Sequence, residues 1–171
     1  MADDEMSPSP PAALDPRLPL TAMQVFKLKK SWKGVKRSLD DTGVEMFIRL
    51  FRSKPPLQRL FRELRGVPVD ELRVSEAMEK HAGRVMAVFD DAINAIENVD
   101  GTDEILCRAA KKHSSIEGFV SDMFWDIEQP FLDAVRITLG DRYTDNMDGI
   151  YRITIKYLLE KLVRGHRALA S

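Results

Sequence analysis

Apolar residues recur every three or four positions from Thr21 almost to the end of the chain, which is the spacing of amphipathic helices. The first stripe starts at Val25 and continues through Trp32 to Leu39. Thr21 and Gln24 have the spacing of a capping box at the start of this helix. No alternating strand pattern bounded by turn residues competes with these stripes. The sequence therefore predicts an all-α fold.

The chain is expected to divide at about residue 20. Residues 1–20 hold five of the nine prolines among small and acidic residues, so we expect a flexible tail that buries too little apolar surface to offset its ordering entropy. Residues 21–171 are expected to form one domain of seven to eight helices. The chain has 171 residues, of which 44% are hydrophobic and 31% charged, and this composition suits a single globular core.

The later helices are placed by the same periodicity. After the first, we expect a second ending near Ser53, a short third after Pro55, a long helix from Ser75, one ending at His113, and two more at about 120–139 and 145–169. Residues 62–74 are polar and contain glycine and proline, so they are expected to form a loop with one helical turn. Pro130 falls inside the expected helix at 120–139.

Two histidines lie on the apolar stripes of their predicted helices, His81 on the long one and His113 at the end of the next. Taken singly, each would more often be a hydrogen-bonded interior histidine than a metal ligand. Two that face one interior suggest a shared ligand, and we expect this ligand to be iron. Cys107 is the only cysteine, which excludes a four-cysteine or Cys-x-x-Cys metal site. His166 belongs to no motif and is expected to be exposed.

A set of residues in a particular order carries a resemblance to a known family. These residues are Ser31-Trp32, Gly43, Phe47, Pro55 followed six residues later by Phe61, the segment Lys80-His81-Ala82-Gly83-Arg84-Val85-Met86, and Lys111-Lys112-His113. From Thr21 to about Gly165 the chain resembles the globin family, and within it the neuroglobin and cytoglobin type more than myoglobin. The interval of 32 residues between His81 and His113 is similar to that of this group.

The resemblance implies a globin fold that encloses a haem, with His113 as the proximal iron ligand and His81 on the distal side. The further haem contacts that we expect are Phe47, Phe61, Lys80, Arg84, Val85 and Phe124. Lys80 and Arg84 would pair with the haem propionates, unless they are ordinary solvated surface cations. The chain has no Cys-x-x-Cys-His motif, so the haem should be a non-covalent haem b. The ring N–H of His113 is expected to donate to a backbone carbonyl one turn earlier, near Ala109.

Three classes of function follow, and we expect the first. It is reversible binding of dioxygen, carbon monoxide and nitric oxide, with a bis-histidyl resting haem in which His81 competes with the gas. The second is redox chemistry on the same haem, such as nitric oxide dioxygenation or nitrite reduction with an external reductase, or redox or oxygen sensing. The third is a haem-free helical signalling domain. Whether the protein is an enzyme is left open.

Charge and hydropathy set the remaining expectations. The net charge is −1 and the isoelectric point about 6.3, so the overall balance attracts neither nucleic acid nor an anionic membrane, although local patches remain open. The N-terminus lacks the pattern of a secretory signal, and no stretch approaches the roughly 18 apolar residues of a membrane span. We expect a soluble cytoplasmic protein, either a monomer or a homodimer that Cys107 could link.

Overall fold

The computed structural model describes residues 13–170, and this part of the chain is helical with no strand. The α-helices are α1 (Ala22–Lys36), α2 (Leu39–Ser53), α3 (Pro55–Gln58), α4 (Glu76–Asn94), α5 (Val99–His113), α6 (Glu128–Leu139) and α7 (Asp145–Ala170). Four 3-10 helices connect them: η1 (Arg62–Leu64), η2 (Val69–Val74), η3 (Ser121–Ile127) and η4 (Gly140–Arg142). The prediction of an all-α fold is confirmed.

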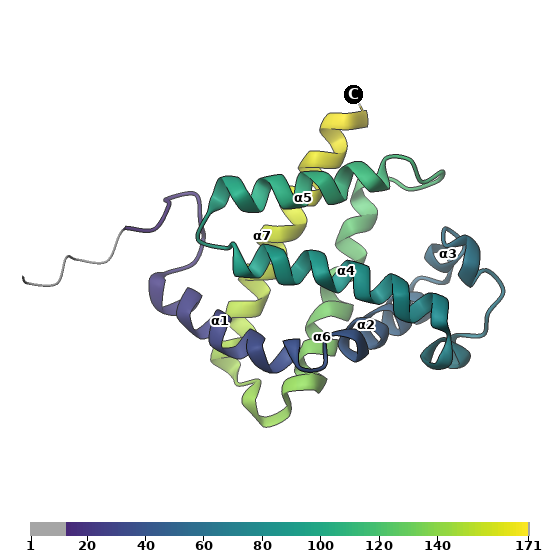
Figure 1. Cartoon of the computed structure of the whole chain (residues 1–171), viewed down its shortest axis with the longest axis horizontal. Helices are drawn as coiled ribbons and strands as arrows, with labels where there is room; N and C mark the ends of the chain where they lie inside the picture. Colours follow the sequence, from purple (N-terminus) through teal and green to yellow (C-terminus); the bar gives the residue numbers. More distant parts are fainter. Residues whose placement is uncertain (1–12, 171) are drawn as a thin grey trace, which may run out of the picture.

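The helices cross in pairs around one core (Figure 1). α4 and α5 run side by side, and α7 crosses behind them and packs most extensively on α5. α2 packs on both α4 and α6. None of the described helices is both long and apolar enough to cross a lipid bilayer.

The first helix starts where the capping residues predict. The Thr21 hydroxyl accepts a hydrogen bond from the Gln24 amide at 3.1 Å, and the Gln24 side chain accepts one from the Thr21 amide at 2.9 Å. Leu20 before the cap and Val25 after it are both buried, which is the pattern of a hydrophobic staple. The helix is shorter than predicted, because α1 ends at Lys36 and Leu39 already belongs to α2.

The predicted tail boundary at residue 20 is wrong for the described residues. Leu18 and Leu20 are only 7% and 4% exposed and belong to the hydrophobic core. Arg17 also forms an ion pair with Asp100 at 3.0 Å, which ties this segment to the start of α5. The tail was predicted from the average composition of twenty residues, and an average does not show that two of their leucines are buried in the core. Residues 1–12 of the expected tail lie outside the described part of the chain.

The single helix predicted at 120–139 is two elements, η3 and α6. α6 begins at Glu128, so Pro130 lies in its first turn, where the missing amide N–H has no partner within the helix to lose. The segment 62–74, predicted as loop with one turn, contains both η1 and η2.

Gly43 allows α2 and α4 to cross closely. A Cβ atom on Gly43 would lie 2.6 Å from the Met86 side chain, 3.1 Å from the Ala82 Cβ and 3.2 Å from the Ala82 carbonyl oxygen. Because part of this wall is backbone, the helices themselves would have to move apart. The α2 backbone at Gly43 therefore lies directly against α4 at Ala82.

We expect Gly43→Ala to destabilise the protein by about 1–3 kcal/mol, the usual effect of overpacking a tight contact. Urea or thermal denaturation measures this change. The matched control is Gly149→Ala in α7, where a Cβ would meet nothing within 4 Å. That substitution should be neutral or stabilise by up to about 1 kcal/mol. Equal losses in the two variants would contradict a tight contact at Gly43.

Candidate functional site

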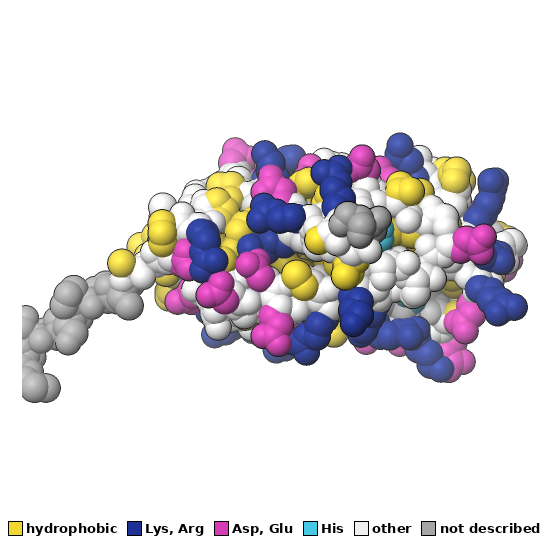
Figure 2. Space-filling view, turned by 90° about the horizontal axis from the view of Figure 1, so that it is seen from above, with side chains coloured by type: hydrophobic (Ala, Val, Ile, Leu, Met, Phe, Trp, Pro, Cys, Tyr) yellow, Lys and Arg dark blue, Asp and Glu magenta, His cyan; other side chains and the backbone are white. Residues whose placement is uncertain are grey.

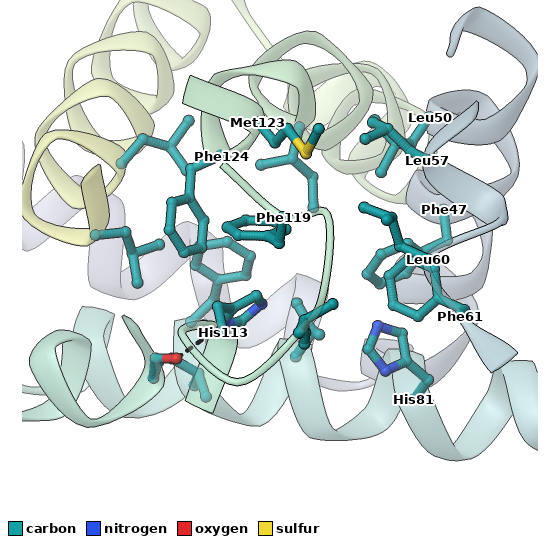
Figure 3. A pocket seen from close by; sticks show the side chains of 18 residues that line it. Phe47, Leu50, Leu57, Leu60, Phe61, His81, His113, Phe119, Met123 and Phe124 are labelled. Carbon is teal, nitrogen blue, oxygen red and sulfur yellow. Dashed lines mark hydrogen bonds between the residues drawn. The ribbon is translucent and has the colours of Figure 1, made fainter. Parts of the chain in front are cut away.

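A largely apolar cavity opens between α2, α3, α4, α5, η3 and α7 (Figure 3). It comprises about 840 Å³ of empty space, counted with the part open to solvent at its mouth. Its walls consist of Phe47, Leu50, Leu57, Leu60, Phe61, His81, Val85, Val88, Phe89, Ala109, His113, Ile116, Phe119, Met123, Phe124, Ile127, Leu159 and Leu162. Only the two histidines in this set have a side chain that donates hydrogen bonds, so any hydrogen bond that a side chain of these walls donates to a ligand comes from an imidazole.

His113, the last residue of α5, is oriented by the helix that carries it. Its Nδ1 lies 2.8 Å from the carbonyl oxygen of Ala109, as predicted from the sequence. A carbonyl oxygen only accepts hydrogen bonds, so Nδ1 carries the proton and Nε2 keeps a free lone pair. Burial lowers the pKa of His113, although the bond to Ala109 acts in the opposite direction. The neutral ring that a metal requires is therefore favoured.

Two phenylalanines hold the His113 ring from the side. The ring centroids of Phe119 and Phe124 lie 5.0 and 4.9 Å from that of His113, and the two phenylalanines contact each other at 4.9 Å. Gly118, with φ of 86°, makes the turn that brings Phe119 to this place. An L side chain rarely adopts this backbone conformation, so the turn depends on glycine.

His81 faces the cavity from α4, within a second aromatic group. Its ring lies 4.8 Å from Phe47 and 4.5 Å from Phe61, in edge-to-face arrangements near 60°. Burial is the main cause that lowers the pKa of His81 to about 4, and the charges of Arg84 and His113 act in the same direction. His81 is therefore neutral at pH 7, and no described residue forms a hydrogen bond with its ring.

The two aromatic groups lie on opposite sides of the open space. Figure 3 shows His113, Phe119 and Phe124 on one side and His81, Phe47 and Phe61 on the other. A flat apolar ligand between them would meet one neutral imidazole on each side. This arrangement suits a metalloporphyrin, because apolar walls contact the macrocycle while an imidazole nitrogen binds the metal.

The predicted apolar site residues all line the cavity: Phe47, Phe61, Val85 and Phe124. The two predicted cations do not. Lys80 points away to Glu76, with an ion pair of 3.4 Å, and its side chain is 70% exposed. Arg84 is exposed on α4, close enough for its charge to lower the pKa of His81. A role of either cation toward haem propionates stays a prediction.

Sequence reasoning missed Phe119 and misplaced His166. His166 was expected to be exposed, yet it is only 5% exposed, with Nδ1 2.6 Å from the Ser121 hydroxyl. Its ring packs on Phe119 and Phe124 at 5.3 and 5.8 Å, behind the pair that holds His113. One signal was available: Leu159, Leu162 and His166 are spaced by three and four, which places all three on one face of a helix. By contrast, no pattern in the sequence places Phe119 beside His113.

Comparisons with known proteins agree with this geometry. The family described as Globin matches residues 44–162. The chain is 30% identical over 97 residues to cytoglobin-1 of Oryzias latipes, which covers 56% of this chain and 55% of that protein. It is 29% identical over 119 residues to neuroglobin of Dissostichus mawsoni, covering 68% of this chain and 74% of that one.

A solved structure is also similar over nearly the whole chain. It is the crystal structure at pH 4 of a hexacoordinated heme protein from an anhydrobiotic tardigrade. It superimposes with a TM-score of 0.87 and 37% identity, over 90% of this chain and 99% of that one. The family match spans well over half of the sequence and the superposition covers 90% of it, so the chain belongs to the globin family.

Proposed function

We propose that this globin binds haem b between His113 and His81 and uses it to bind diatomic gases reversibly. The proposal rests on one observation: two neutral imidazoles lie on opposite sides of a cavity that is otherwise apolar. The tardigrade protein with the same fold is described as a hexacoordinated heme protein, which supports haem as the ligand here. No cysteine lies among the residues that line the cavity, which fits a haem held without covalent bonds.

His113 is proposed as the proximal ligand. The Ala109 carbonyl fixes the ring tautomer, so Nε2 is the nitrogen free to bind iron, and the hydrogen bond makes that nitrogen more basic. Phe119 and Phe124 restrict rotation of the ring and keep water away from it. A haem held by His113 would supply the iron to which dioxygen, carbon monoxide or nitric oxide binds.

His81 is proposed to compete for that position. Phe47 and Phe61 contact its ring on the same side of the cavity and limit where it can move. Because the ring is neutral, it can offer a lone pair to iron in the resting protein or donate an N–H hydrogen bond to a bound gas. A gas must then displace His81, and its apparent affinity falls in proportion to the fraction of protein with an open position.

Absorption spectra of the ferric, deoxy ferrous and carbon monoxide forms test both histidines. We expect the natural protein to show low-spin, six-coordinate spectra in its ferric and deoxy ferrous forms. His81→Leu should keep its haem but give a five-coordinate, high-spin ferrous spectrum. His113→Leu should lose most of its haem during purification, because it lacks the proposed proximal bond.

His166→Leu is the matched control for these substitutions, since it removes a third buried imidazole that does not line the cavity. We expect this variant to retain haem with an unchanged coordination number. A ferrous spectrum that is the same before and after His81→Leu would contradict ligation by His81. Purified protein without a Soret band, despite haem supplied during expression, would favour the haem-free signalling domain instead.

Competition by His81 also predicts a gain in gas affinity when the histidine is removed. If His81 holds the iron for nine-tenths of the time, His81→Leu should raise the equilibrium affinity for carbon monoxide about tenfold. Titration of the ferrous protein with carbon monoxide measures this change. An affinity that falls would show that the imidazole assists the gas, and one that stays constant would show no net competition by His81.

A redox catalyst would use the same residues as a reversible gas carrier, so kinetic measurements are needed to distinguish the two functions. A gas carrier must keep its oxygenated ferrous form for minutes or longer, whereas a redox catalyst turns over with an electron donor. Stopped-flow mixing of the oxygenated protein with nitric oxide or of the deoxy ferrous protein with nitrite, followed by re-reduction with an added reductase, makes the distinction. Rapid multiple turnover would favour nitric oxide dioxygenase or nitrite reductase activity over reversible binding.

A further inference from the structure

The outer face of α1 exposes two large apolar side chains. Met23 is 61% exposed and Phe26 is 63% exposed, although they belong to a helix whose other face is buried in the core. They are three residues apart, so they lie next to each other in the first turns of α1. Exposing a phenylalanine and a methionine side by side leaves apolar area in water that a binding partner could remove.

Cations continue the same face toward the end of the helix. Lys27, Lys30, Lys33 and Arg37 follow at spacings of three and four and are all exposed. None of the four forms an ion pair with a described residue. The lysines on the flanks of the face differ, because Lys29 pairs with Glu97 at 2.6 Å and Lys36 with Asp90 at 3.5 Å. On α1, the positive charge without an ion pair to a described residue therefore lies along one stripe. We call Met23, Phe26, Lys27, Lys30, Lys33 and Arg37 the α1 ridge.

A rotation of α1 that buried the ridge would disrupt the fold. The capping box fixes the start of α1, and the preceding Leu18 and Leu20 are themselves buried, so they do not cover the ridge. Trp32, on the opposite side of α1, is 2% exposed and donates a hydrogen bond to Asp90 at 2.9 Å. The exposure of Met23 and Phe26 is thus imposed by the way the inner face is anchored.

We propose that the α1 ridge binds peripherally to an anionic lipid bilayer. A helix that carries cations beside exposed aromatic and other large apolar side chains is the form that lies in a membrane interface. Phe26 and Met23 would enter the boundary between headgroups and acyl chains. Lys27, Lys30 and Lys33 would lie among anionic headgroups, where each cation adds to the attraction.

A bilayer fits the ridge better than a protein partner with a negative surface. The apolar side chains protrude from a convex helix, and a bilayer admits such side chains anywhere, whereas a protein must offer a matching pocket. The attraction must also be local, because the whole chain has a net charge of −1. On the face around α5, acidic and basic side chains are interspersed (Figure 2). That face therefore has no stripe of positive charge comparable to that of the α1 ridge.

Binding at the ridge would leave the cavity accessible. None of the residues that line the cavity comes from α1, and α1 lies away from α3 in Figure 1. Substitutions on the ridge should therefore leave the absorption spectrum unchanged, and their outcome is independent of the proposed gas binding.

Cosedimentation of the full-length, haem-loaded protein with lipid vesicles tests the proposal. One set of vesicles is phosphatidylcholine alone, and the other contains about one third phosphatidylserine. We expect binding to the anionic vesicles only, and weaker binding as the salt concentration rises. The charge variant Lys27→Gln/Lys30→Gln/Lys33→Gln and the apolar variant Met23→Ser/Phe26→Ser should each weaken binding by at least about tenfold.

Two control variants match these changes elsewhere on the surface. Lys54→Gln/Lys156→Gln/Arg164→Gln removes three exposed cations without ion pairs to described residues, and Ile137→Ser replaces an apolar side chain that is 55% exposed. Both should bind vesicles within about twofold of the natural protein, and all variants should keep its melting temperature and spectrum. Equal losses in ridge and control variants, or binding that ignores phosphatidylserine, would overturn the proposal. Retention on poly-L-glutamate with no binding to anionic vesicles would also overturn it, in favour of an acidic protein partner.

Discussion

The close crossing of α2 over α4 determines where the distal half of the site lies. Gly43 has no Cβ, so its backbone lies directly against Ala82, the neighbour of His81 in the sequence. One turn later on α2, Phe47 reaches the His81 ring at 4.8 Å. A separation of the helices by even a fraction of an ångström would loosen this aromatic contact. A packing constraint at a glycine thus controls the position of an imidazole on the neighbouring helix.

The proximal half depends on a different kind of constraint, a hydrogen bond within one helix. The bond from His113 Nδ1 to the Ala109 carbonyl oxygen holds the imidazole against the preceding turn of α5. The same bond leaves Nε2 without its proton. Burial then opposes protonation of both histidines, because a charged imidazole loses hydration in an apolar cavity. The apolar walls therefore pack the core and also keep two potential metal ligands neutral.

The spacing of apolar residues was enough to predict which residues of the regular helices face the interior. His81, His113 and Phe47 lie on unbroken stripes, and the order of Trp32, Pro55 and Phe61 identified the family. Phe119, Leu18 and Leu20 were missed for a physical reason: they lie in irregular segments, where the positions of side chains depend on single backbone angles, such as φ of Gly118, and on what the core takes up. His166 was predicted to be exposed because it is polar and belongs to no motif. Its helical spacing from Leu159 and Leu162 nevertheless places it on their buried face.

The two faces of α1 serve separate purposes, and this explains how a binding surface could be added without cost to the cavity. On the inner face, Trp32 stacks on Phe131 at 6.3 Å, and Phe131 contacts the cavity wall through Phe89 at 5.3 Å. This chain of aromatic contacts supports the cavity from the outside. On the outer face, Phe26, Lys27, Lys30 and Lys33 are exposed. Selection could therefore change the charge and apolar area of the ridge while the contacts that position His81 and His113 stay the same.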